Sequence, residues 1–316
     1  MAAIILKQAN PGYIEGESLG TGALDKAVDA YRTRYNKYPL QGSQWFKTEE
    51  AKGGVFKIET YGQTLELPRE NLDADQIPFA TPVKGFSKSF TVVNYRLGIQ
   101  IERRFKEDQL MAVADKMASG LVQAGRLHTE YAFADVINNA TTATKTGADG
   151  VALAANNHPQ ERRATGTWSN LETAAALTHG TFSTARKNMR KRTDEFGYPQ
   201  PIKPQQLVVP AELEQKAKEI FASERVDDNA LNTKNVWKDS VDIFIYDYMT
   251  STTAWMLWGD RPKEFCGLHY VRSVPMSIVP TEGADKSTDI IDGRRLRHRF
   301  VVGFSTERNL QYNAGA

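Results

Sequence analysis

The stretch EDQLMAVADKMASGLVQAGRLHTEYAFADVINN, residues 107–139, decides the fold because it predicts one very long helix. Two acids open it, where they favour the positive end of a helix, and two asparagines close it. Apolar residues recur at helical spacing from Leu110 through Leu121 to Ile137. At 1.5 Å per residue the helix would be roughly 50 Å long, about three times the usual length. Such an element cannot bury itself, so we expect it to pack against other segments.

Two glycines lie inside this predicted helix, at Gly120 and Gly125. Each costs about 1 kcal/mol relative to alanine in a helix interior. We therefore expect close packing or a bend at these two positions.

The segment before the helix is typical of β-structure. Val55–Tyr61 and Phe90–Gln100 are rich in β-branched and aromatic residues, which predicts two strands. Between them lies LELPRENLDADQIPFATPVKG, residues 65–85, with three prolines and six charged residues. Hairpin connections usually have about two to five residues. The long polar excursion therefore predicts a functional loop or an interaction arm.

The first 46 residues predict an arm rather than a domain. Glycines interrupt the first part, and a short helix is expected at Ala23–Tyr35. Apolar periodicity is too sparse for an independent core, so we expect this arm to pack on something else.

The segment after the long helix mixes helices and strands. We expect a short strand at Val151–Ala154 and a second helix at Leu171–Lys191. Next comes PQQLVVPAELEQKAKEIF, residues 204–221, which predicts a strand, a proline corner and a helix. This corner has no glycine and carries Glu212, which would repel a phosphate, so we interpret the corner as structural.

The last quarter of the chain is predicted to return as strands. We expect strands at Val241–Tyr246, Ala254–Trp258 and Leu268–Val274. The chain then ends in RLRHRFVVGFSTERNLQYNAGA, residues 295–316, which predicts a long strand followed by a polar tail.

Composition sets broad limits. The chain has 316 residues, of which 41% are hydrophobic and 25% charged, and its net charge is +2. These values are ordinary for a globular protein of one large or two to three smaller domains, and they exclude a strong global field towards nucleic acid or membrane. No apolar run is long enough to span a bilayer, and the first residues lack a signal-peptide pattern. We expect a soluble protein that is used without export.

Cysteine and histidine usage argues against common catalytic and metal sites. Cys266 is the single cysteine, which excludes an intrachain disulfide and a multi-cysteine metal site. His269 follows three residues later, and in a strand the two would face opposite sides. No two of the five histidines stand three or four residues apart, so we expect structural roles for all of them: His128, His158, His179, His269 and His298.

Other catalytic and ligand-binding motifs are also incomplete. Ser251 and Ser305 lack the glycines of a nucleophile elbow. GESLGTG, residues 16–22, lacks the Lys-Ser/Thr of a phosphate loop. The acid pairs in NLDADQI and TDIIDGRR lack a full calcium-loop pattern and are expected to be solvated turns. We predict no catalytic, cofactor-binding or metal residue, and no enzyme.

Basic residues concentrate in Arg186–Arg192 and in Arg294–Arg299. In a strand, the second cluster would place Arg295, Arg297 and Arg299 on one face and its apolar residues on the other. Such a row suits an acidic protein partner, packaged nucleic acid or an ordinary solvated face, and the sequence leaves these three readings open.

Three stretches carry a resemblance to a known family: IQIERRFKEDQL, LVVPAELEQKAKEIF and HRFVVGFSTERNLQYNAGA. With the order of the predicted elements, the chain resembles a tailed-bacteriophage major capsid protein of the Hong Kong 97 fold. Within that fold it is most similar to the Mu-like major head subunit family, over almost the whole chain.

The resemblance implies an α+β fold of five parts. They are an N-terminal arm (1–47), an extended β-hairpin loop (48–102) with its tip near Leu67–Phe79, a peripheral domain (103–170) with the spine helix at 107–139, a mainly axial domain (171–265), and returning strands with a C-terminal tail (266–316). The strand–proline–helix corner would be scaffold in the axial domain.

The resemblance also implies a function. Copies would form pentamers and hexamers that tile an icosahedral shell around double-stranded DNA, bound non-specifically, and no membrane would be involved. Some members carry a long internal scaffold before the loop, whereas only a short arm precedes it here. A separate scaffolding protein is therefore expected, together with a portal and, as an option, a decoration protein. The product would be part of the virion, assembled in the bacterial host cytoplasm.

Five residues are candidates for ion pairs between subunits. Arg69 and Glu70 would lie at the loop tip, and Arg103, Arg104 and Glu107 near its base. Simple solvation of each is the competing interpretation.

Three alternatives stay open. The same fold could form an encapsulin-type nanocompartment around a cargo enzyme. A hydrolase using Cys266 belongs to a different class, and a tail or adaptor protein would be another virion component. The predicted hairpin and spine helix argue against the last of these.

Overall fold

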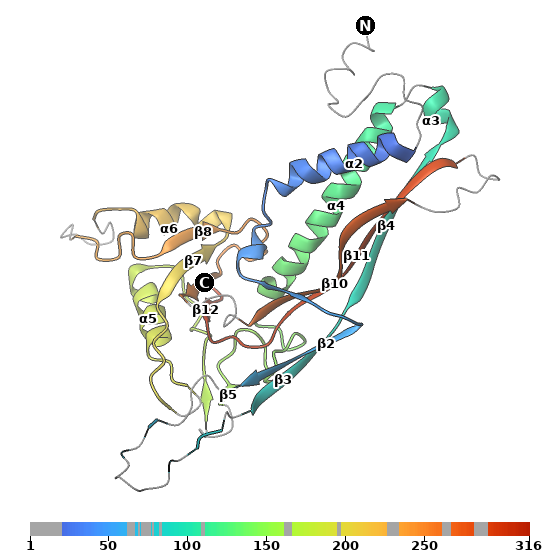
Figure 1. Cartoon of the computed structure of the whole chain (residues 1–316). Coiled ribbons are helices and arrows are strands. Elements are labelled where there is room, and N and C mark those ends of the chain that lie inside the picture. The colour runs from blue at the N-terminus through green and yellow to red at the C-terminus, as the bar shows by residue number, and fades with distance from the viewer. Residues whose placement is uncertain are drawn as a thin grey trace.

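A long helix lying along a twisted four-stranded sheet dominates the computed structural model of the chain (Figure 1). The structure describes residues 21–61, 67–68, 70, 77, 79–81, 84–108, 111–160, 166–194, 197–225, 234–260, 267–280 and 290–316. Arg69, Cys266 and most of the predicted loop tip lie outside the described residues.

The four-stranded sheet has the order β1-β10-β11-β4. Its strands are β1 (Lys47–Glu50), β10 (Leu268–Pro280), β11 (Ile290–Phe304) and β4 (Val93–Glu102). β1 runs parallel to β10, and the other two pairings are antiparallel. The two long strands come from the end of the chain, and the sequence pattern predicted only half of β10, Leu268–Val274.

The helix α4 (Met111–Asn138) covers one face of this sheet. Small residues on the helix, Ala114 and Ala118 among them, pack with Ile101 and Ile278 of the strands. On another side, α2 (Thr21–Asn36) packs against α4, and Tyr31 Oη donates a 2.5 Å hydrogen bond to Asp115. The expected N-terminal helix is thus confirmed, and its packing partner is the long helix.

The long helix is shorter than predicted. The helix predicted over 107–139 corresponds to α4, which begins at Met111, and Glu107 is the last residue of a separate short helix, α3 (Arg103–Glu107). The 28 residues of α4 correspond to about 42 Å of helix at 1.5 Å per residue. The apolar stripe indicated the helix correctly, but the two acids expected to open it, Glu107 and Asp108, lie before its first residue.

The two helix glycines differ in their surroundings. A Cβ atom on Gly125 would lie 2.4 Å from Leu296 Cδ1 and 2.6 Å from Met276 Sδ, so the sheet approaches the bare helix backbone there. Around Gly120, no heavy atom of the described residues lies within 4 Å of such a Cβ. Close packing is confirmed at Gly125 and is absent from the described surroundings of Gly120.

A two-stranded hairpin base projects beside the main sheet (Figure 1). It consists of β2 (Val55–Tyr61), as predicted, and β3 (Lys84–Thr91). The expected second strand, Phe90–Gln100, was wrong in its limits. β3 ends at Thr91, and β4 pairs with β11 in the larger sheet, where Tyr95 contacts His128 and Ile101 packs with Ala114 of α4.

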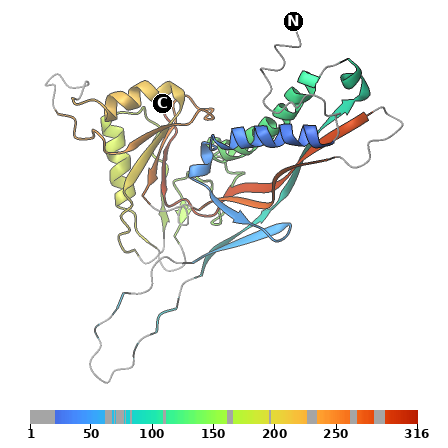
Figure 2. The same ribbon diagram turned by 45° about the horizontal axis from the view of Figure 1, so that its top comes forward.

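A second sheet has the order β12-β9-β7-β8. Its strands are β7 (Pro204–Val209), β8 (Asp242–Ile245), β9 (Trp255–Gly259) and β12 (Leu310–Asn313), and the helices α5 (His179–Arg190) and α6 (Glu214–Phe221) lie beside it in Figure 2. Phe182 of α5 and Phe221 of α6 meet edge to face, 4.6 Å between ring centroids, above buried strand residues. The strand–proline–helix corner is confirmed, with a short 3-10 turn (η2, Ala211–Leu213) before α6.

Three other expectations here were wrong. The helix predicted over Leu171–Lys191 begins only after Thr178, whose hydroxyl caps it by accepting from Thr181 N–H. Val151–Ala154 is not a strand and contributes one isolated bridge, between Ala152 and Thr146. The polar tail is not free, because β12 is buried in all four of its residues.

A shared core joins the two sheets. Trp45, just after the 3-10 helix η1 (Gly42–Gln44), stacks on Trp258 of β9 at 5.8 Å, and its Nε1 donates to Gln206. Glu130 of α4 accepts from Gly42 N–H (2.7 Å) and from the Tyr246 hydroxyl (3.0 Å). Burial raises the pKa of the Glu130 carboxyl, although these two donors oppose the shift. The helix, the N-terminal segment and the second sheet therefore form one packed body.

Two smaller features complete the fold. β5 (His158–Pro159) and β6 (Thr167–Trp168) form a short hairpin near the C-terminal segment. Across the described residues, no helix combines the length and the apolar character that a membrane span requires.

Candidate functional site

The exposed face of the long sheet carries a row of arginines. In β11, Leu296, His298 and Phe300 are buried on the side of α4, whereas Arg295 and Arg297 are exposed and Arg299 is half-buried. This confirms the alternation expected from the sequence. Arg294, which the sequence grouped with this cluster, is instead fully buried and donates to the carbonyl of Gly293 at 2.9 Å.

Cross-strand pairing adds a fourth arginine to this row. Arg297 lies directly opposite Arg96 of β4, and Arg295 and Arg299 lie opposite Gly98 and Asn94. Within the described part of the chain, no carboxylate pairs with Arg96, Arg295 or Arg297. Directly opposed like charges are destabilising in a sheet. The arginine face, defined as Arg96, Arg295, Arg297 and Arg299, is therefore suited to an anionic partner.

The strand β4 lies at the edge of this sheet. Among the described residues, it pairs with β11 on one side only, so its other edge presents backbone donors and acceptors. Val93 and Leu97 on this strand are large apolar residues and about half exposed. An edge of ten residues with exposed apolar side chains is a surface that another chain could cover.

Among the described residues of the predicted loop tip are three exposed apolar side chains. Leu67 and Ile77 are more than half exposed, and Phe79 is 91% exposed. Single exposed apolar residues are common, but three within thirteen positions on a long connection are typical of a contact surface.

The predicted ion-pair residues lie at the surface. Arg69 is outside the described residues, and Glu70 is exposed. Arg103, Arg104 and Glu107 belong to α3 and are exposed, and Arg104 Nε lies 2.8 Å from Glu102 Oε2 of the same chain. An exposed pair of this kind contributes about 0–1 kcal/mol. Their role between subunits stays a prediction.

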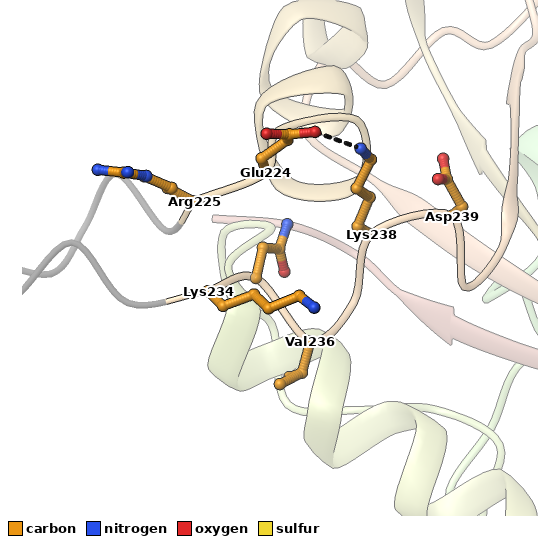
Figure 3. Close-up of a pocket in the computed structure, with 7 residues that line it drawn as sticks. Glu224, Arg225, Lys234, Val236, Lys238 and Asp239 are labelled. Carbon is orange, nitrogen blue, oxygen red and sulfur yellow. Dashed lines mark hydrogen bonds and ion pairs between the residues drawn. The ribbon is translucent and has the colours of Figure 1, made fainter.

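An open hollow lies next to α6, the helix beside the second sheet (Figure 3). Apart from Val236, its described lining is polar or charged, and Lys238 Nζ lies 3.0 Å from Glu224 Oε1. The ion pair raises the pKa of Lys238. Among the described residues, the lining includes no histidine, cysteine or serine. The arrangement is that of a solvated surface, and its described residues offer no nucleophile with a base.

One arrangement that the sequence did not indicate has the order of an acyl-transfer triad. Ser305 Oγ lies 2.7 Å from His269 Nε2, and His269 Nδ1 lies 3.6 Å from Glu49 Oε1. Burial lowers the pKa of His269 to about 4, although Glu49 opposes the shift. Ser305 is only 4% exposed, and the gap to Glu49 exceeds hydrogen-bond distance. These residues pack the junction of β1, β10 and β11, and Ser305 is out of reach of a substrate.

Two further histidines, His298 and His128, have packing roles. His298 is buried, with its Nε2 2.8 Å from the Tyr270 hydroxyl, and burial lowers its pKa to about 4. His128 of α4 contacts Tyr95 and Phe300 on the sheet, at 4.3 and 5.7 Å between ring centroids. The structural role expected for His128 is therefore consistent with its contacts. Cys266, on which the hydrolase hypothesis depends, lies outside the described residues.

Comparison with protein families identifies one match. The model of a family described as "Phage capsid protein" matches residues 86–313. No curated protein sequence matches the chain.

Solved structures agree in fold at low sequence identity. The procapsid of bacteriophage JBD30 aligns with a TM-score of 0.52 at 13% identity, covering 93% of this chain and 74% of that chain. A Microbacterium phage Oxtober96 chain gives 0.52 at 8% identity, covering 87% and 90%. The holo-SrpI encapsulin complex from Synechococcus elongatus PCC 7942 also gives 0.52, at 11% identity, covering 88% of each chain. At these identities the likeness concerns the fold alone, a mixed α+β fold found in shell-forming proteins.

Proposed function

The chain belongs to the phage capsid protein family, and we propose that it builds a tailed-phage head from pentamers and hexamers. It is a major capsid protein, a structural component of an icosahedral virion shell. The family match carries this conclusion because residues 86–313 include α4 and most strands of both four-stranded sheets. These strands are β4, β10 and β11 of the first sheet and β7, β8, β9 and β12 of the second. Membership of the Mu-like subfamily stays part of the proposal.

We assign the domains as the resemblance implies. The arm is 1–47, the extended loop 48–102, the peripheral domain 103–170, the axial domain 171–265, and the returning strands and tail 266–316. Within the 48–102 segment, β1 and β4 pair with strands of the main sheet, so we propose that the part projecting as a loop is the β2–β3 hairpin, from about Val55 to Thr91. The sheet that contains the corner and α6 would form the axial wedge.

The loop is proposed to reach over a neighbouring subunit. Phe79, Ile77 and Leu67 are exposed on the isolated chain, and a neighbour would remove them from water. Arg69 and Glu70 at the tip, with Arg103, Arg104 and Glu107 at the base, would add ion pairs that fix the orientation of neighbours.

The arginine face is proposed to contact phosphate groups of packaged double-stranded DNA. Its side chains lack described carboxylate partners and repel one another, and phosphate would relieve that repulsion. Such contacts would be independent of base sequence. A scaffolding protein, a portal and an optional decoration protein, with assembly in the host cytoplasm, complete the proposal on the family resemblance.

The encapsulin alternative has one observation in its favour. The encapsulin chain aligns with the same TM-score as the JBD30 procapsid chain. The family match favours the phage reading. Purified particles distinguish the two, because a phage head encloses DNA and a nanocompartment encloses a cargo protein.

A substitution at the loop tip tests the proposed contact. Burial of a phenylalanine side chain contributes about 2 kcal/mol, so Phe79→Ser should weaken each subunit contact about 30-fold. Val236→Ser is the matched control, because Val236 is 77% exposed on the rim of the hollow in Figure 3. Light scattering would measure the protein concentration at which particles form, and urea denaturation would check the stability of the subunit.

We expect Phe79→Ser to raise the assembly concentration with unchanged subunit stability, and Val236→Ser to change neither. Deletion of residues 68–78 should have a larger effect of the same kind. Normal assembly by both tip variants would refute the role of the loop without affecting the family assignment.

A further inference from the structure

Three potential metal ligands meet where the β5–β6 hairpin contacts the C-terminal segment. His158 Nδ1 lies 2.7 Å from Asp149 Oδ2 and 3.3 Å from Glu307 Oε1. The three ligand atoms lie within 4.8 Å of one another. The side chains are only 0%, 4% and 6% exposed for His158, Asp149 and Glu307. Charged groups this deeply buried require compensation.

The hydrogen bonds of Asn170 determine which nitrogen of His158 carries a proton. Asn170 Nδ2 donates to the Leu153 carbonyl (2.7 Å), and its Oδ1 accepts from Ala155 N–H (2.8 Å). The amide is therefore oriented with Oδ1 towards His158 Nε2, 3.1 Å away. Since Oδ1 is an acceptor only, Nε2 must be the donor.

This orientation has a consequence for Nδ1. In the neutral ring with a proton on Nε2, Nδ1 presents a lone pair to two carboxylate oxygens. Three electron-pair donors then converge on one point in a dry environment, which is repulsive unless a cation lies between them. The buried Arg192 guanidinium offsets part of the charge of Glu307, while it donates to the Leu310 carbonyl. A cation among Asp149, His158 and Glu307 would remove the repulsion between their three facing lone pairs.

We propose that Asp149, His158 and Glu307 form a structural binding site for a divalent first-row transition metal ion such as Zn²⁺. One nitrogen and two carboxylate oxygens are ligands that such ions accept. A second proton on the ring would also supply positive charge. One N–H, however, points along one direction, whereas a metal ion serves all three ligand atoms at once.

The residues around the cluster match those that support metal ligands elsewhere. A metal-bound histidine usually donates its other N–H to a carbonyl or carboxylate oxygen, as His158 does to Asn170. The second oxygen of Asp149 accepts from Val151 N–H at 3.0 Å, which orients the carboxylate. Trp168 stacks on the His158 ring at 4.7 Å, so the ring cannot turn freely.

A metal ion here would tie together distant parts of the chain. Asp149 and His158 follow the long helix, and Glu307 lies just before β12. The guanidinium groups of Arg192 and Arg308 lie over Trp168, and they donate to backbone carbonyls of the same region. The proposed ion would hold the segment before β12, an edge strand of the second sheet, against Asp149 and His158, a role separate from subunit contacts.

Metal content of the full-length, untagged protein tests the site. Protein incubated with ZnCl₂ and dialysed should retain about one equivalent of zinc per chain by mass spectrometry. CoCl₂ in place of zinc should give the visible absorption bands of cobalt with nitrogen and oxygen ligands. Both measurements work on subunits or on shells, so they do not depend on the assembly proposal.

His158→Gln and Glu307→Gln should each weaken zinc binding at least about 10-fold. Glu49→Gln is the matched control, because Glu49 lies beside another buried histidine, His269, with a single carboxylate. This control should retain zinc and the cobalt spectrum. If either test variant fails to fold, the cobalt spectrum of the unmodified chain still decides. Zinc retained equally by His158→Gln, or no cobalt bands in the unmodified protein, would overturn the proposal in favour of a doubly protonated His158.

Discussion

Alanine substitutions at Gly120 and Gly125 of α4 should change the free energy of unfolding by different amounts. Both glycines lie inside the same helix, so each substitution gains about 1 kcal/mol of helix propensity. At Gly120 the described surroundings are open, and the gain should appear in full.

At Gly125 the new methyl group meets the sheet. It would lie 2.4 Å from Leu296 Cδ1 and 2.6 Å from Met276 Sδ, and Leu296 is buried. Both side chains must shift, and overpacking of this kind costs about 1–3 kcal/mol. Gly125→Ala should therefore be neutral or up to about 2 kcal/mol destabilising after the propensity gain. The propensity contribution is common to both variants, so their difference, about 1–3 kcal/mol, measures the helix–sheet contact alone.

Urea denaturation of dissociated subunits, followed by circular dichroism at low protein concentration, would measure both values. Low concentration matters because assembly would add its own stabilisation. Equal stabilisation by the two substitutions would show that Gly125 does not lie against Leu296, and the packing of α4 on the sheet would have to be abandoned.

Two further predictions concern charge. Burial lowers the pKa of His269 and His298 in the folded chain to about 4, whereas an exposed histidine has a pKa of about 6.5. Between these two pH values the unfolded chain therefore binds more protons than the folded chain. Stability should be full above pH 6.5 and fall as the pH drops towards 4, and urea midpoints that stay constant over this range would contradict the burial of both rings. Replacing Arg295 and Arg297 by glutamine should weaken the binding of subunits to double-stranded DNA and reduce its salt dependence. The control Lys116→Gln, at an exposed position of α4, should change neither. Equal effects of the two changes in a filter-binding assay would show that the arginine face is not the contact.

Local sequence patterns predicted those elements that form from neighbouring residues, whatever segment they later pack against. The apolar stripe of α4, the β-branched run of β2 and the strand–proline–helix corner each depend on neighbouring residues. The alternation of β11 was also predictable, because period two follows from the strand itself.

Features set by distant segments were not predictable. β4 looked like a hairpin strand, yet its partner is β11, about two hundred residues further along the chain. The tail looked polar, but its polar groups are buried because they bond to other segments, as Asn313 does to Thr173 and Ala175. The cluster of Asp149, His158 and Glu307 has no sequence signature, since Glu307 lies far from the other two along the chain, near its C-terminus.

Electron microscopy of the purified protein, alone and with phage lysate proteins, tests the central claim most directly. We predict rings of five or six subunits, tubes or closed shells, and DNA rather than a cargo protein inside shells recovered from infected cells. A species that stays monomeric under all these conditions would contradict the assignment as a major capsid protein.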